Sequence, residues 1–303
     1  MALRVTLDIF SGRPNPVVII HGAEERELLQ RLAAPRKGAP ATERRRKPAR
    51  LPPSLLGYRG VLIERLDEHT RSRRAAPEGP ASLRVANGFA YGPRAALPTR
   101  DPAFEEFVCG PTGPFRVAGF DPDFFDICPE LIHRFRDTVL KWPWKIWPWP
   151  IRPRCTCAPL WEPKWWNDAG QVQYNNNCYN YGTNYRTDTY AQPGRANGAM
   201  YTSITCPAVR AGAVADALIA SPTANNRCPN EGHLVALVIG PGWDYHWYRK
   251  GRNGYWTHKP GGTQATNLDN SGHLISDPRT ADRGNYTDFC TFMVVMHGHV
   301  KIR

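Results

Sequence analysis

The stretch DYHWYRKGRNGYWTHKPGG, residues 244–262, sets the fold of the second half of this 303-residue chain. Aromatic and polar residues flank a Gly-Arg-Asn-Gly turn, which is typical of two antiparallel strands joined as a hairpin. Two further apolar runs, at 232–240 and 288–297, are bounded by marked turns such as GPGWD and DNSG. Consecutive antiparallel pairing is the simplest arrangement of these runs, so we predict a meandering sheet.

Two helices are predicted before this sheet. Residues 178–190 follow three asparagines, and asparagine caps helix N-termini well. Residues 207–220, PAVRAGAVADALIA, are rich in alanine and amphipathic. Helices followed by an antiparallel sheet define an α+β domain, which we place at 166–303.

The first part of the chain predicts a second, smaller α+β module at 1–125. LRVTLDIF and VVII read as strands around the turn SGRPNP, and GAEERELLQRLAA reads as a helix with one leucine-rich face. GYRGVLIERL returns to a strand pattern. Between them, residues 34–54 form a basic, Pro- and Ala-rich loop that cannot bury apolar surface.

A Pro- and Trp-rich connecting segment is predicted at 126–165. KWPWKIWPWPIRPRCTCAPLWEPKWW, residues 141–166, holds seven of the ten tryptophans, and its prolines exclude a regular helix. We therefore expect an extended chain here. Its indoles either clamp the segment to a neighbouring domain or form an exposed stacking surface for a sugar, a peptide or single-stranded nucleic acid.

Charge and cysteine content bear on partners and compartment. The net charge is +12, but residues 36–50 alone hold seven Arg or Lys against one Glu, so an acidic partner is expected at this loop. Nucleic acid is not the expected partner, because the tryptophans lie in a different, proline-broken segment. No apolar run is long enough for a membrane span, and no secretory signal is recognisable. These features predict a cytoplasmic protein with most of its eight cysteines reduced.

Cys178 is the candidate nucleophile, since a thiol at a helix N-terminus beside an imidazole can ionise. His246 on one strand and His258 on the next are the candidate base and orienting group. Asn176 and Asn177, or the Cys178 amide, are candidates for an oxyanion hole. The aromatic residues nearby are candidates for contacting substrate: Tyr181, Trp247 and Trp256.

At these residues the sequence resembles the papain-like superfamily, and more narrowly NlpC-like peptidases, over about 130 residues of the C-terminal half. The resemblance implies a helix-plus-antiparallel-sheet domain with a Cys178–His246–His258 triad. It departs from the papain pattern at the oxyanion glutamine, which lies six residues before the cysteine there, whereas Gln171 and Gln173 lie seven and five residues before Cys178. The resulting hypothesis is a thiol-dependent hydrolase or acyl-transferase that acts on an amide bond of a peptide or a peptidoglycan-like substrate.

Each of these residues also has a structural interpretation. Cys178 can be a buried small side chain, His246 can pack among aromatics, and His233 competes as the base. Cys155 and Cys157 stand too close together for an ordinary zinc pair, and no matching pair exists, so no metal and no cofactor are expected. The alternative hypothesis is therefore a non-catalytic binding or structural protein, with an aromatic recognition surface and a basic loop for an acidic partner.

Overall fold

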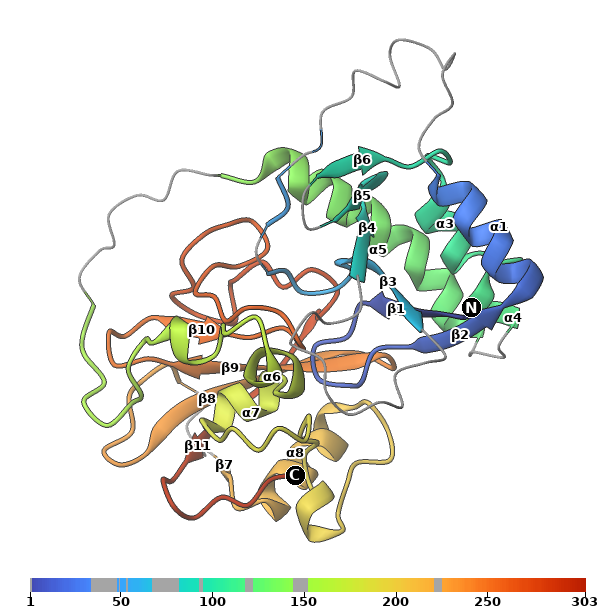
Figure 1. Cartoon of the computed structure of the whole chain (residues 1–303). Helices are drawn as coiled ribbons and strands as arrows, with labels where there is room; N and C mark the ends of the chain where they lie inside the picture. Colours follow the sequence, from blue (N-terminus) through green and yellow to red (C-terminus); the bar gives the residue numbers. More distant parts are fainter. Residues whose placement is uncertain are drawn as a thin grey trace, which may run out of the picture. The chain divides into compact units, whose positions relative to one another are not determined.

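The computed structural model describes residues 2–33, 48, 50–52, 54–66, 82–92, 95–117, 122–143, 152–220 and 225–303 (Figure 1). The chain divides into two compact units. Unit 1 comprises Met1–Ile9, Asn15–Leu51 and Tyr58–Leu140; unit 2 comprises Phe10–Pro14, Pro52–Gly57 and Lys141–Arg303. Each unit combines helices with an antiparallel sheet, so the predicted α+β class is confirmed.

Unit 1 is built on a six-stranded antiparallel sheet in the order β2-β1-β3-β4-β5-β6. Alternate residues of the first strand, Leu3, Val5 and Leu7, are buried because successive side chains point to opposite faces. The predicted strands of the N-terminal module are therefore present. The strands are β1 (Ala2–Asp8), β2 (Val17–His21), β3 (Gly60–Leu66), β4 (Ser82–Ala86), β5 (Phe89–Tyr91) and β6 (Ala96–Pro98).

Among the described residues of this unit, the helices beside the sheet are α1 (Gly22–Leu32), α3 (Phe104–Cys109), α4 (Pro114–Val117) and α5 (Pro122–Lys141) (Figure 1). Helix α1 matches the predicted helix and buries Leu28. Helix α5 covers the first part of the predicted connecting segment 126–165 and ends where the stretch 141–166, which was expected to be extended, begins. The sequence pattern did not indicate this helix, which a disulfide between Cys109 and Cys128 ties to α3.

Unit 1 also buries a charged cluster. The carboxylate of Asp8 accepts hydrogen bonds from Arg59 at 2.7 Å and from Arg84 at 2.9 Å. The two guanidinium groups hold the pKa of Asp8 well below its usual range, although burial acts most strongly and in the opposite direction. The aspartate of the DIFSGRPNP motif is thus a structural anchor of the sheet.

Unit 2 is built on a five-stranded antiparallel sheet in the order β10-β9-β8-β11-β7. The predicted hairpin is present: Trp256 pairs with Lys250 and His258 pairs with Tyr248. The other apolar runs form the two long strands β8 and β11, but the predicted meander is only partly correct: β8 pairs with β9 as expected, whereas β11 pairs with β8 and not with β10. The strands are β7 (Ile219–Ala220), β8 (His233–Gly240), β9 (Asp244–Lys250), β10 (Trp256–His258) and β11 (Asp288–Val295).

The helices of unit 2 are short: η1 (Pro163–Trp165), α6 (Gln171–Asn175), α7 (Cys178–Thr183), η2 (Arg195–Asn197) and α8 (Cys206–Ala215). Helix α7 ends well before the predicted residue 190, because Asn184 adopts a left-handed conformation (φ 64°) that closes the helix. Its residues are all buried, and it packs on β9 (Figure 1). A Cβ atom on Gly182 would lie 3.2 Å from the Trp247 side chain, so the glycine permits this close packing.

The main core of unit 2 lies between this sheet and the helices α7 and α8. Alternate residues of β8 and β9 face it, among them Val235, Leu237, Tyr245 and Trp247. A smaller cluster joins Trp166 to Tyr181, whose rings meet edge to face at 5.1 Å. Trp166 is therefore buried within unit 2 itself, whereas Trp165 is 57% exposed, and the clamp onto a neighbouring domain stays a prediction. Trp144, Trp147 and Trp149 lie outside the described residues.

Candidate functional site

Cys178 begins α7, and its side chain is completely buried. It belongs to the main core of unit 2, together with Tyr245 and Trp247. Burial raises the pKa of the Cys178 thiol well above its usual value; the Asp244 carboxylate acts in the same direction, and the Trp247 backbone amide opposes both. A nucleophilic cysteine requires a lowered pKa. The surroundings of Cys178 therefore favour a neutral thiol.

Asn176 and Asn177, the oxyanion candidates, use their side chains to hold the backbone. The Asn177 amide oxygen accepts from the backbone amides of Tyr179 and Asn180 at 3.0 and 3.1 Å, which caps α7. Its amide nitrogen donates to the carbonyls of Gly12 and Ala191, both at 2.8 Å. A primary amide has two donor hydrogens and two acceptor lone pairs, so the Asn177 side chain is fully engaged.

The Asn176 side chain is engaged in the same way. Its nitrogen donates to the Val172 carbonyl at 2.8 Å and to the Asp188 carboxylate at 2.6 Å. Its oxygen accepts from the backbone amides of Thr187 and Asp188, both at 3.1 Å. Both asparagines therefore connect the start of α7 to the segment 187–191, and neither has an amide hydrogen left over for a developing oxyanion.

His246 and His258 are brought together in the interior of unit 2. Nε2 of His246 lies 2.9 Å from Nδ1 of His258, and Nε2 of His258 lies 2.9 Å from the Leu268 carbonyl. Tyr248 completes the group, with its ring stacked on His258 and edge-on to His246. Burial lowers the pKa of His258 to about 4. This imidazole is therefore neutral at physiological pH.

The three aromatic residues predicted to contact substrate are all buried. Tyr181, Trp247 and Trp256 have no exposed surface. The Tyr181 hydroxyl donates to Thr257 at 2.8 Å, and the Trp256 indole donates to Asn226 at 2.8 Å. These rings stabilise the core of unit 2 and present no surface to a ligand.

The competing base, His233, lies at the start of β8 and is also buried. Its Nε2 lies 2.8 Å from the Gly182 carbonyl, so it joins the sheet to α7. Burial lowers its pKa from 6.5 to about 3. The residue therefore contributes to packing as a neutral imidazole.

The His233 pKa predicts acid lability. Its folded pKa lies below its unfolded pKa, so the unfolded chain binds more protons and stability falls as the pH drops through 6.5 towards 3. Because His233 takes up a proton only in the unfolded chain, we expect it to lower the free energy of unfolding by about 2 kcal/mol between pH 7 and pH 5. The variant His233→Gln keeps a donor for the Gly182 carbonyl. In urea titrations, its free energy of unfolding should fall less between pH 7 and pH 5, by about the same amount. An unchanged pH dependence in this variant would contradict the assignment.

A buried carboxylate that the sequence analysis did not single out organises the same region. Asp244, at the start of β9, accepts from the backbone amides of Ser11 at 2.5 Å and Arg13 at 3.0 Å. It also accepts from the Tyr286 hydroxyl at 2.6 Å. Burial raises the pKa of Asp244, and these donors act in the opposite direction. The available signal was the SGRPNP turn, whose backbone amides need an acceptor.

A second connection joins the SGRPNP turn to the segment 186–195. The Gly12 carbonyl, in the turn, accepts from the side-chain amides of Asn177 and Gln192, both at 2.8 Å. The side-chain oxygen of Gln192, in that segment, accepts from the Tyr245 hydroxyl at 2.9 Å. Residues close to the candidate nucleophile thus form a polar network whose groups satisfy one another.

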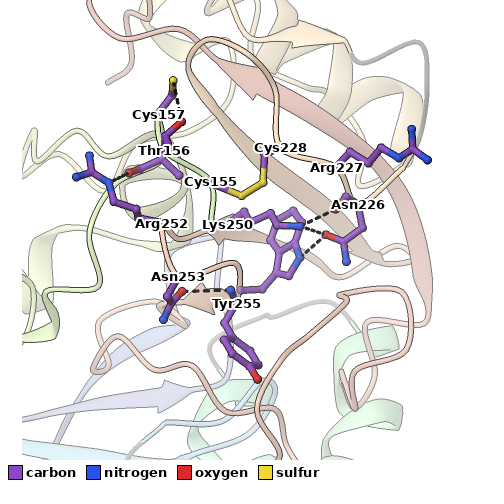
Figure 2. The surroundings of a disulfide bond; sticks show 12 residues. Cys155, Thr156, Cys157, Asn226, Arg227, Cys228, Lys250, Arg252, Asn253 and Tyr255 are labelled. Atoms are coloured by element: carbon purple, nitrogen blue, oxygen red, sulfur yellow. Dashed lines mark hydrogen bonds between the residues drawn. A yellow bond between two sulfur atoms is a disulfide. The ribbon is translucent and has the colours of Figure 1, made fainter. Parts of the chain in front are cut away.

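Six of the eight cysteines form disulfides, so the expectation of mostly reduced thiols is wrong. The pairs are Cys109–Cys128, Cys155–Cys228 and Cys206–Cys290. The two cysteines of the sequence CTC differ in their bonding: Cys155 forms a disulfide (Figure 2), whereas Cys157 is an exposed free thiol. Spacing along the chain did not reveal these pairings, because the partners in the last two lie 73 and 84 residues apart.

Within the described ranges, no group of three or more His, Cys, Asp or Glu side chains is arranged to hold a metal ion. None of the helices in the described part of the chain combines the length and apolar character that a membrane span requires. Of the predicted basic loop 34–54, residues 34–47, 49 and 53 lie outside the described residues.

Comparison with known proteins gives one informative relative. No family model and no solved structure matches the chain. Insoluble matrix shell protein 1 of Ruditapes philippinarum is 47% identical over 141 residues, which cover 91% of that protein and 46% of this chain. The chain therefore belongs to the family of insoluble matrix shell protein 1. The resemblance to papain-like proteins remains a prediction.

Two expectations are corrected by this relationship. The main hypothesis of a thiol-dependent hydrolase or cysteine peptidase acting on an amide substrate is wrong, because the family's named member is a shell matrix protein. The buried Cys178 with its raised pKa agrees with this correction. The predicted cytoplasmic location is also wrong, since it conflicts with the same relative and with three disulfides.

Proposed function

We propose that this chain is a non-catalytic structural component of an extracellular, insoluble shell matrix. The observation that carries the proposal is the 47% identity to insoluble matrix shell protein 1 over 91% of that protein. Identity at this level over nearly a whole relative supports a shared role. About half of this chain lies outside the aligned residues.

The structure supports a structural role at the level of individual groups. The side chains that suggested chemistry are engaged in holding the fold: Asn177 caps α7, His233 joins β8 to that helix, and Cys178 fills the core. A catalytic group must meet a substrate, whereas these are fully buried. The three disulfides suit an oxidising extracellular location and a protein that must persist there.

Structural interactions are the kind of partnership that this role implies. An acidic macromolecule remains the proposed partner of residues 36–50, on the basis of their seven basic residues against one Glu. Electrostatic attraction of this kind is screened by salt, so contacts made by the segment should weaken as ionic strength rises.

An antibody raised against the chain tests the proposal in the organism that makes it. We expect the protein in the insoluble residue of the demineralised, salt- and detergent-washed hard matrix, and not in the soluble fraction of cell lysates. Recovery mainly from the cytosol, with its cysteines reduced, would overturn the proposal. The purified chain should also lack amide-hydrolysing activity that depends on Cys178.

A further inference from the structure

A cluster of arginines surrounds the disulfide between Cys155 and Cys228. The bond brings the Cα atoms of these residues to 5.4 Å, and an arginine immediately precedes each cysteine: Arg154 on one segment and Arg227 on the other. Both arginines are exposed. Covalent pairing therefore brings two exposed arginines from distant parts of the sequence next to one disulfide.

Two more arginines join them from neighbouring positions. The backbone amide of Cys155 donates to the Arg252 carbonyl at 3.0 Å, and Nε of Arg252 donates to the Ala158 carbonyl at 3.2 Å. Arg152 lies over the Tyr255 ring at 5.1 Å. Figure 2 shows Arg252 on one side of the disulfide and Arg227 on the other. We refer to Arg152, Arg154, Arg227 and Arg252 as the arginine cluster.

The positive charge of this cluster is poorly balanced. Among the ion pairs of the described residues, none involves these four arginines. Asp277, which raises the pKa of Lys250, forms an ion pair with Arg279 at 2.6 Å. Glu231 is one exposed carboxylate on the Cys228 segment. Within the described residues, the charges of these four arginines are therefore not neutralised by an ion pair.

The pKa of Lys250 also reflects the positive charge nearby. Its ammonium group donates to Asn226 beneath the disulfide (Figure 2). Burial, and to a smaller extent Arg152, lower the pKa of Lys250 to about 8, and Asp277 acts in the opposite direction. A negatively charged group bound at this surface would relieve the repulsion between these cations.

We propose that the arginine cluster binds an acidic polypeptide, a segment rich in Asp or Glu. Planar guanidinium groups match carboxylates in a two-bond geometry, which favours carboxylate ligands. Because Arg252 and Arg227 lie on different sides of the disulfide, an extended chain that crosses the disulfide is suited to contact both.

The spacing of the cluster also fits such a chain. Arg152 and Arg154 flank Pro153, which holds the backbone before it extended, so the two arginines are about 7 Å apart. Alternate side chains of an extended acidic segment repeat at the same distance of about 7 Å. This binding is a property of the purified chain and holds whether or not the chain resides in a shell matrix.

The test measures binding of a fluorescein-labelled oligo-aspartate of about 12 residues, long enough at about 3.3 Å per residue to cross the cluster. Fluorescence anisotropy is followed with the full, oxidised chain and with the triple variant Arg154→Gln, Arg227→Gln, Arg252→Gln. The matched control is Arg26→Gln, Arg65→Gln, Arg210→Gln, which removes the same charge from exposed positions elsewhere. We expect the cluster variant to bind about tenfold more weakly and the control to bind like the original chain.

A second variant keeps the test decisive if Arg252, whose side chain bonds to Ala158, proves necessary for folding. Arg154→Glu with Arg227→Glu changes two exposed side chains and should abolish the salt-sensitive binding, with an unchanged melting temperature. Equal loss in the cluster and control variants would overturn the proposal, because binding would then follow net charge alone. Arginine-dependent binding of heparin without binding of oligo-aspartate would overturn it too, since the partner would be a sulfated polysaccharide.

Discussion

Replacing Cys206 and Cys290 together by alanine should lower the free energy of unfolding by about 4 kcal/mol. The bond joins the first residue of α8 to β11 across 84 residues, so its loss releases a long loop in the unfolded chain. Both cysteines also pack against the main core of unit 2. The bond thus restricts the unfolded state and contributes to packing in the folded one.

Equilibrium unfolding in guanidinium chloride without reductant measures this loss. The control is Cys157→Ser, which changes an exposed free thiol and should shift stability by less than about 0.5 kcal/mol. A loss of less than about 1 kcal/mol in the double variant would show that the bond does little to hold the unit together.

Asp244→Ala should be almost as damaging, with an expected loss of about 3–5 kcal/mol. The substitution leaves the buried backbone amides of Ser11 and Arg13 and the Tyr286 hydroxyl without their acceptor. Asp244→Asn should not restore stability, because every group facing the carboxylate is a donor and one of them would meet the new amide nitrogen.

Thermal and denaturant unfolding of both Asp244 variants provide the measurement. Glu231→Ala, at an exposed position in the same unit, is the control and should be near neutral. If Asp244→Asn is as stable as the original chain, the carboxylate is not the anchor of the 11–13 turn.

The sequence predicts the elements of this protein better than their boundaries or covalent links. Alternation and turn residues were sufficient for the hairpin of β9 and β10, because both signals are local. The end of α7 was missed, since nothing in the pattern shows that Asn184 turns left-handed. The pairing of Cys206 with Cys290 depends on how α8 meets β11, which spacing along the chain does not contain.

At the candidate site, the sequence predicted the positions of residues but not their burial or their hydrogen-bond partners. The sequence pattern correctly predicted that Cys178 lies at a helix N-terminus and that His246 lies close to His258. It could not reveal that α7 is buried throughout, and burial outweighs the dipole of a helix this short in setting the thiol pKa. Nor did it reveal that the side chains of Asn176 and Asn177 are occupied by distant backbone groups such as the Gly12 carbonyl.

Alkylation of each cysteine by iodoacetamide, read by peptide mass spectrometry, tests the central claim most directly. For a structural protein held by disulfides, Cys157 alone should react in the native state, and Cys178 should react only after unfolding. The other six cysteines should react only after reduction. Rapid labelling of native Cys178 below pH 7 would contradict the claim, because it would show an activated thiolate at a position that the account assigns to the core.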